Sequence, residues 1–251
     1  GKCYGGPAYY IEAALHSRGL AVVFCIAMIL TYAFGFNMLA SYNLQSTFAG
    51  QPFYNADITP WIIGGILALV MGWCLLGGGN RIVKVTSTLV PFMGIAYILV
   101  SLLVVVLNIG QLPSVMAQIF KEAFDFKAIF AGFAGSAMMQ GIRRGLYSNE
   151  AGIGSAPNAA ASAVVSHPVK QGLVQMLSVF IDTLLLCTAT AIMCLVSGVI
   201  PAKELQGAPW VQAALHKTLG SFGPYFIMIA MVLFAFTTLL GNCFYCDNLL
   251  T

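Results

Sequence analysis

Apolar residues dominate six long runs of the chain, and short stretches rich in polar residues, glycine and proline separate them. The runs cover residues 20–50, 60–77, 85–109, 128–145, 170–199 and 222–243. A helix needs about 20 apolar residues to cross the roughly 30 Å hydrocarbon core of a bilayer. We therefore predict six transmembrane helices. The first and fifth runs are longer than this, which predicts that their helices tilt or extend beyond the bilayer.

The fourth run, 128–145, is the weakest of the six and is rich in glycine. It contains Gly132, Gly135, Gly141 and Gly145, and Arg143 and Arg144 lie just before its end. Glycine costs about 1 kcal/mol relative to alanine inside a helix, so this run favours a helix that is broken in mid-membrane. The free backbone groups at such a break can hold a carboxylate or a cation. Close packing of small residues against a neighbouring helix is the alternative interpretation.

The composition agrees with a lipid environment. Hydrophobic residues make up 59% of the chain and charged residues 8%, whereas soluble domains carry about 25% charged residues. The chain therefore has too few charges to cover a soluble domain, and we predict an all-α membrane protein whose single transmembrane domain covers residues 1–251. No catalytic constellation or cofactor motif is recognisable, which excludes an enzyme. The net charge of +3 without a basic cluster argues against nucleic acid as a partner.

The two ends and the basic residues predict how the chain is oriented. It begins at Gly1 and stops at Thr251 directly after an apolar run, so we expect an internal segment of a longer protein. Six crossings would place both ends on one side of the membrane. Most basic residues fall on that side, which the positive-inside rule makes cytoplasmic. They are Lys2, Arg18, Arg81, Lys84, Arg143, Arg144 and Lys170.

Several polar residues lie inside the apolar runs, where they are costly and often functional. Asn37, Ser41 and Gln45 are spaced i, i+4, i+8, so they share one helical face that points toward other helices or a wet cavity. Asp182 lies well inside the fifth run. An ion path and a hydrogen bond to a buried donor are equally good interpretations of this carboxylate.

Two further patterns have chemical interpretations. The adjacent hydroxyls of Thr237 and Thr238, late in the last run, suit a cation that takes oxygen ligands, although back-bonding to the preceding helical turn is the simpler interpretation. Cys243 and Cys246 have a metal-like spacing. No histidine or second cysteine pair lies near them, so we do not expect a metal site.

Three stretches resemble one transporter family. They are GGPAYYIE from Gly5 to Glu12, MMQGIRRGLYSNEAGIGSAPNAA from Met138 to Ala160, and LFAFTTLLGNCFYCDNLL from Leu233 to Leu250. Together they resemble the alanine or glycine:cation symporters, also called sodium:alanine symporters. The resemblance covers essentially the whole chain.

The resemblance implies a fold as well as a family. Its members share the inverted-repeat (LeuT-like) fold of the bacterial leucine transporter, within the amino acid–polyamine–organocation (APC) superfamily. In that fold the first and sixth of ten core helices are broken in mid-membrane. The six runs would be core helices three to eight, and the run at 128–145 would be the broken sixth helix. N-terminal and C-terminal helices of the same protein would be missing here. The missing first core helix would supply part of the substrate and sodium sites, so this segment alone is not expected to transport.

The resemblance also implies site residues. Those that would line the substrate pocket are Gln45 and Phe48 on the first run and Met138, Met139 and Ile142 on the broken helix. Many members carry tryptophan after the glycine of the last run, where this chain has Asn242, which leaves the size of the pocket open. The implied sodium ligands are the Phe234 carbonyl and the hydroxyls of Thr237 and Thr238.

The stretch from Arg143 to Ala160 is the clearest family signature, but its role is open. Arg143 or Arg144 would be able to pair with Glu150 and gate the inner mouth. A surface ion pair contributes only about 0–1 kcal/mol, so a structural role is favoured. Glu150 and Asp182 are also the two carboxylates that could serve an ion path.

The predicted function is sodium-coupled symport of a small neutral amino acid, alanine or glycine, by alternating access. The expected partners are the amino acid, sodium and the lipid of a bacterial or archaeal plasma membrane. The nearest alternative is a proton-coupled amino acid transporter in which Asp182 or Glu150 carries the proton. A channel and a purely structural membrane subunit are the other classes. Uptake assays with and without sodium separate sodium-coupled from proton-coupled transport.

Overall fold

The structure is a computed structural model that describes residues 5–124, 136–150, 152–200, 202 and 205–250. All regular secondary structure in these residues is helical, which confirms the predicted class. Five helical segments are long and apolar enough to cross a membrane, and they match the first, second, third, fifth and sixth predicted runs. They are Arg18–Phe48, Thr59–Leu76, Arg81–Leu107, Pro168–Val196 and Phe222–Leu250.

The fourth predicted run lies partly outside the described residues. Gly132 and Gly135, and with them most of the predicted break, fall in 125–135. Its remaining part forms α8, Ser136–Asn149. The count of six spans and the inverted-repeat fold therefore stay predictions.

The spans are not all uniform α-helices. The first contains α2 (Arg18–Leu30), the π-helical segment η1 (Thr31–Phe36) and α3 (Asn37–Phe48). The span that matches the fifth predicted run, which we call the fifth span, has the same pattern. It contains α10 (Pro168–Phe180), η3 (Ile181–Leu186) and α11 (Cys187–Val196). The other three are α4 (Thr59–Leu76), α5 (Gly78–Leu107) and α13 (Phe222–Leu250). π-Helical segments are rare and often lie at functional sites.

The segments before and between the spans, which lie outside the predicted runs, contain short helices. These are α1 (Pro7–Leu15), the 3₁₀ turn η2 (Ile109–Gln111), α6 (Leu112–Ala123), α9 (Ser155–Ala161) and α12 (Ala208–Leu219). The expected connection at 77–84 is also mostly helical, because α5 begins at Gly78. Proline stands at the first or second position of α1, α4, α6, α10 and α12. Its fixed φ suits a helix start and needs no N–H partner there, so these prolines begin helices.

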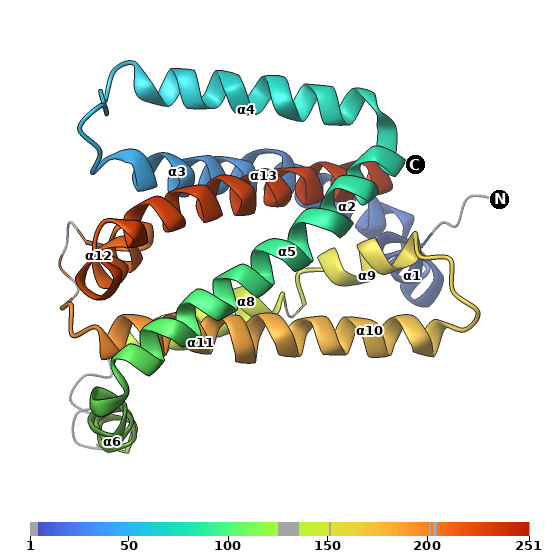
Figure 1. Ribbon diagram of the computed structural model, residues 1–251. Helices are drawn as coiled ribbons and strands as arrows, with labels where there is room; N and C mark the ends of the chain where they lie inside the picture. The colour runs from blue at the N-terminus through green and yellow to red at the C-terminus, as the bar shows by residue number, and fades with distance from the viewer. Residues whose placement is uncertain (1–4, 125–135, 151, 201, 203–204, 251) are drawn as a thin grey trace.

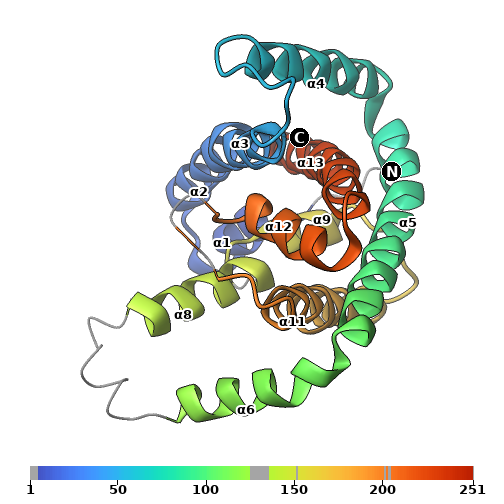
Figure 2. The ribbon, with the colours of Figure 1, turned by 60° about the vertical axis from the view of Figure 1, so that its left-hand side comes forward.

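Helix α13 is the central helix of the bundle. Of its most apolar window 39% is buried inside the protein, compared with 17–22% for the other four spans. Figures 1 and 2 show α13 beside α3, with α5 crossing its other side and α12 across one end. Leu239 and Leu240 of α13 pack with Met71 and Cys74 of α4 and Ile82 of α5 in one of the two apolar cores.

The short helices gather at the two ends of the bundle. In Figure 1, α1, α9 and the end of α13 lie at the right, whereas α6 and α12 lie at the left. We call the first of these the inner end, after the orientation that the basic residues predict. The second is the outer end.

Polar side chains tie the spans to one another. The Asn242 amide on α13 donates to Asn37 Oδ1 on α3 at 2.7 Å, and the hydroxyls of Tyr97 on α5 and Thr190 on α11 are 2.8 Å apart. Apolar helix surfaces gain little from one another in lipid, so such bonds and close packing hold the helices together.

The contact between α12 and α13 depends on Gly223. A Cβ added there would lie 2.6 Å from the carbonyl carbon of Leu215, which is backbone. We predict that Gly223→Ala destabilises the full-length protein by about 1–3 kcal/mol, the usual cost of overpacking. Gly94→Ala is the matched control, because a Cβ at Gly94 meets nothing within 4 Å. Thermal unfolding in detergent measures both variants, and equal midpoints would contradict the prediction.

Candidate functional site

A small cleft lies where the first span, α8 and α13 meet. Its volume is about 180 Å³, and its polar lining consists of Asn43 on α3, Tyr147 on α8 and Thr238 on α13. Phe36 and Phe234 supply aromatic walls. The cleft therefore combines hydroxyl and amide groups with apolar surface, which is the usual make-up of a small-molecule site.

The two adjacent threonines of α13 have different surroundings. Successive helical residues point about 100° apart. The Thr237 hydroxyl is buried and donates back to the carbonyls of Leu233 at 3.0 Å and Phe234 at 3.1 Å. Thr238 lines the cleft. Thr238 therefore lines the cleft, whereas the Thr237 hydroxyl is bonded to its own helix. The Phe234 carbonyl accepts that hydroxyl.

The polar stripe of the first span does not gather in one place. Asn37 is bonded to Asn242, which is the interhelical role that buried polar residues often have. The Gln45 amide donates to the Tyr54 hydroxyl, and the Phe48 ring lies edge-on to Phe53 with centroids 6.4 Å apart. Both partners, Tyr54 and Phe53, come from the loop that follows α3. Neither Gln45 nor Phe48 lines the cleft in this structure.

Asn43 lines the cleft in their place and was not singled out from the sequence. Its carbonyl accepts from Ser46 and Thr47, both at 2.8 Å. The available signal was its position, a polar residue within an apolar run. The i, i+4, i+8 spacing drew attention to Asn37, Ser41 and Gln45 instead.

Helix α8 brings Tyr147 into the cleft. The Tyr147 ring stacks on Phe36 of η1, with centroids 5.4 Å apart and planes 4° from parallel. Met139, Ile142, Arg143 and Arg144 are exposed on the same helix. The side chain of Met138 lies outside the described part of the chain. Tyr147 lies inside the family signature, and this was the signal that could have identified it.

Glu150 and Asp182 both bond to serines. Glu150 Oε2 accepts from Ser155 Oγ at 2.6 Å, so the partner of this carboxylate is the first residue of α9. Asp182 Oδ2 accepts from Ser148 Oγ of α8 at 3.0 Å. The carboxylate of the fifth span is thus held by the residue that follows Tyr147.

The signature stretch also docks α9 on the inner end of α13. Asn158 is fully buried, and its amide donates to the Tyr245 carbonyl at 3.0 Å. Its own carbonyl accepts from the Asn248 amide at 3.5 Å. A helix of the predicted connection is therefore fixed to the central helix of the bundle.

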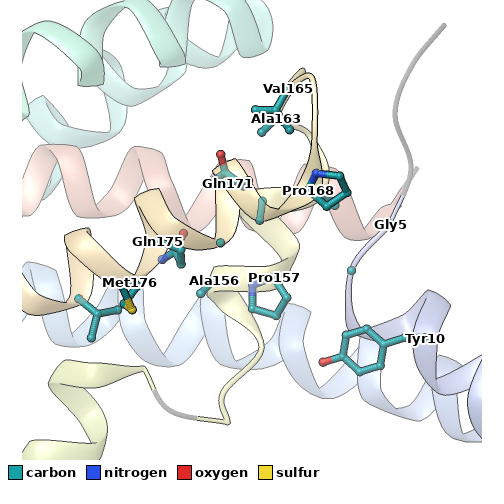
Figure 3. Close-up of a pocket in the computed structure, with 15 residues that line it drawn as sticks. Gly5, Tyr10, Ala156, Pro157, Ala163, Val165, Pro168, Gln171, Gln175 and Met176 are labelled. Atoms are coloured by element: carbon teal, nitrogen blue, oxygen red, sulfur yellow. The ribbon is translucent and has the colours of Figure 1, made fainter.

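A larger cavity lies elsewhere in the described part of the chain. It measures about 710 Å³ at the inner end and lies between α1, α9 and α10, where Tyr10, Pro157 and Gln171 form part of its walls (Figure 3). Most of the other lining residues are small or apolar, and none of the predicted site residues lines it. Its size alone does not make it the candidate site. The smaller cleft is the better candidate because polar groups from three segments converge there.

Comparison with known proteins decides the family. A family model described as the sodium:alanine symporter family matches residues 1–251. This chain belongs to the sodium:alanine symporter family. That family consists of multi-pass membrane transporters and not of enzymes, and the five candidate membrane spans of this chain agree with it.

The curated relatives carry related names. The chain is 37% identical over 248 residues to the sodium/alanine symporter AgcS of Methanococcus maripaludis, covering 98% of this chain and 54% of that protein. It is 43% identical over 242 residues to the probable sodium/glutamine symporter GlnT of Bacillus subtilis, covering 96% and 50%. It is 42% identical over 255 residues to the putative sodium/proton-dependent alanine carrier protein YrbD of Bacillus subtilis, covering 96% and 52%. This member of the family thus spans about half the length of these relatives.

Proposed function

We propose that the full-length protein couples the entry of sodium to the uptake of a small neutral amino acid, alanine or glycine, across a bacterial or archaeal plasma membrane. The observation that carries the proposal is the family match over residues 1–251. The cleft between α3, α8 and α13 supports it, because a hydroxyl, an amide and aromatic walls from separate segments meet there. The relatives' names include both alanine and glutamine, and a small cleft favours the smaller amino acid.

Coupling in this proposal is a linkage between two ligands. If sodium and the amino acid stabilise the same occupied state, each raises the affinity for the other by the same factor. One sodium that moves down a potential of about 100 mV releases about 2.3 kcal/mol. This corresponds to roughly 50-fold accumulation of the amino acid, since about 1.4 kcal/mol is a factor of ten. Alternating access then exposes the loaded site to each side of the membrane in turn.

Uptake of radiolabelled alanine and glycine tests the proposal. Full-length protein in proteoliposomes should accumulate either amino acid when sodium is outside, and replacement of sodium by potassium should reduce the initial rate at least tenfold. An imposed inside-negative potential should raise the rate, because net positive charge enters with the substrate. Vesicles without protein serve as the control for leakage.

The same vesicles separate the competing functions. Uptake that persists without sodium and follows an imposed pH gradient would replace sodium symport by proton symport. A continuous current that does not saturate with substrate would indicate a channel. Binding or uptake of glutamine in preference to alanine would keep sodium coupling and correct the substrate.

A further inference from the structure

Two π-helical segments from distant parts of the chain contact neighbouring residues of α8. Segment η1 belongs to the first span and η3 to the fifth. Figure 2 shows α8 beside the fifth span, and η3 is the described element that it packs against most closely. Because π-helical segments are rare, their meeting at one short helix indicates a specific arrangement.

Asp182 of η3 and Cys187, the first residue of α11, both face Ser148. The Ser148 hydroxyl lies 3.0 Å from Asp182 Oδ2 and 3.3 Å from Cys187 Sγ. Residues five apart point roughly 140° away from each other in an α-helix at 3.6 residues per turn. A π-helix closes i to i+5, so the wider turn between Asp182 and Cys187 brings both onto the face that meets α8. The irregular turn is therefore what makes this contact possible.

The η1 segment holds the preceding residue, Tyr147. Phe36 is the last residue of η1, and its ring lies between two others. It stacks on Tyr147 at 5.4 Å and on Tyr32 at 4.9 Å. Tyr32 in turn meets Tyr245 of α13 edge-on at 5.2 Å. Consecutive residues of α8 thus bind different spans, one through aromatic rings and the next through a hydrogen bond.

We propose that Asp182 is a positioning residue, which holds α8 through the hydrogen bond from Ser148 and so places Tyr147 in the cleft, and that it carries neither a proton nor an ion. This inference rests on the proposed function and assigns a role within it. Ser148 directly follows Tyr147, and Tyr147 and Thr238 share the cleft. A shift of Ser148 therefore moves a wall of the site, although Asp182 does not itself line the cleft.

The two possible roles of Asp182 need different chemistry. Holding Ser148 requires an oxygen that accepts a hydrogen bond, which an amide also supplies. Carrying a proton or sodium requires a carboxylate that binds and releases a charge. Asp182→Asn keeps the acceptor and removes the charge, whereas Asp182→Ala removes both. This pair of variants separates position from charge.

Alanine uptake by the full-length protein in proteoliposomes is the test. Asp182→Asn should stay within about twofold of the wild type in KM and kcat, with unchanged sodium and pH dependence. Asp182→Ala should raise the alanine KM about fivefold or more, as expected for the loss of a bond to a charged acceptor. Ser148→Ala should have a similar effect. The double variant Ser148→Ala with Asp182→Ala should be no worse than either single one, because both remove the same contact.

A second measurement checks the geometry independently of transport. In Ser148→Cys the introduced thiol should form a disulfide with Cys187 when copper phenanthroline is added to the full-length protein. The same substitution in a Cys187→Ala background is the control and should not cross-link there. A failure to cross-link Cys187 would show that α8 does not pack on η3, and the inference would be wrong even if the variants lose activity through misfolding.

The outcomes that overturn the inference are distinct from failure of the proposed function. Loss of uptake or an altered pH profile in Asp182→Asn would identify Asp182 as a charge carrier. Wild-type kinetics in Asp182→Ala would show that Asp182 neither positions α8 for uptake nor carries a charge. If the wild-type protein itself shows no sodium-dependent uptake, the proposed function fails, and the cross-link between the Ser148→Cys thiol and Cys187 still reports whether α8 is held by η3.

Discussion

Thr238→Val should raise the sodium concentration needed for half-maximal alanine uptake by about tenfold or more, whereas Thr237→Val should change it by less than about threefold. Valine keeps the shape of threonine and removes only the hydroxyl oxygen. Thr238 lines the cleft, and we expect its hydroxyl to contact the ion or the substrate there. Loss of a ligand to a charged group costs about 1.5–3 kcal/mol, and about 1.4 kcal/mol is a factor of ten.

Thr237 is the matched control because it has the same side chain as Thr238 but does not line the cleft. Its hydroxyl donates to the carbonyls of Leu233 and Phe234 in its own helix. These carbonyls are also the acceptors for the helix N–H groups, so loss of the back-bond costs little. Sodium titrations of initial uptake rates by the full-length protein measure both variants, and Thr238→Ser should restore the wild-type value.

The contrary result has a clear meaning. If Thr237→Val weakens sodium dependence as much as Thr238→Val, the Thr237 hydroxyl must turn from its back-bond toward the ion when sodium binds. The resemblance to the family implies that both hydroxyls take part. The structure instead predicts unequal effects, and the titration decides between them.

The spans could be predicted from the sequence because the bilayer fixes their length. The predicted run 60–77 corresponds to α4 at Thr59–Leu76, and 170–199 corresponds to a span at Pro168–Val196. A helix that crosses the hydrocarbon core needs nearly continuous apolar residues. Such segments stand out whatever their neighbours are, so their positions follow from the residues alone.

The short helices between the spans could not be predicted in the same way. Polar residues and prolines in 200–221 indicated a connection, yet Pro209 begins α12. The same residue types favour turns and helix N-termini. The choice between the two depends on packing, and α12 packs on α13 through Gly223 and Leu215. The sequence pattern contains no signal of that contact.

The candidate site was predicted in part for a similar reason. Thr238, which the resemblance implies as a sodium ligand, lines the cleft, and that role stays a prediction. Asn43 and Tyr147 also line the cleft but are not among the implied site residues, and Gln45 bonds to Tyr54 instead. An extra residue in a π-helical turn rotates everything beyond it relative to an ideal helix. Asn37, Ser41 and Gln45 all follow η1 in the regular helix α3, so their i, i+4, i+8 spacing still gives them one face. It does not say in which direction η1 turns that face.

Gly154→Ala should be the most damaging single-methyl substitution in the signature stretch. Gly154 has φ = 95° and precedes α9. A Cβ there would lie 2.8 Å from Cζ of Phe24 on α2 and 3.1 Å from Cγ of the buried Pro7 on α1. The left-handed conformation costs a non-glycine residue about 1–2 kcal/mol, and overpacking adds about 1–3 kcal/mol. The structure therefore predicts that α9 is pushed away from α1 and α2, which disturbs its place on α13.

Gly152→Ala separates these two costs. Gly152 also has a positive φ, +77°, but a Cβ there meets nothing within 4 Å. This variant should lose only the conformational part, so its unfolding midpoint in detergent should fall between those of the wild type and Gly154→Ala. Sodium-driven alanine uptake by the full-length protein should follow the same order, since Asn158 holds α9 on the Tyr245 carbonyl of the helix that carries Thr238. Equal losses in the two glycine variants would mean that backbone strain alone matters and that the contact with Phe24 and Pro7 does not fix α9.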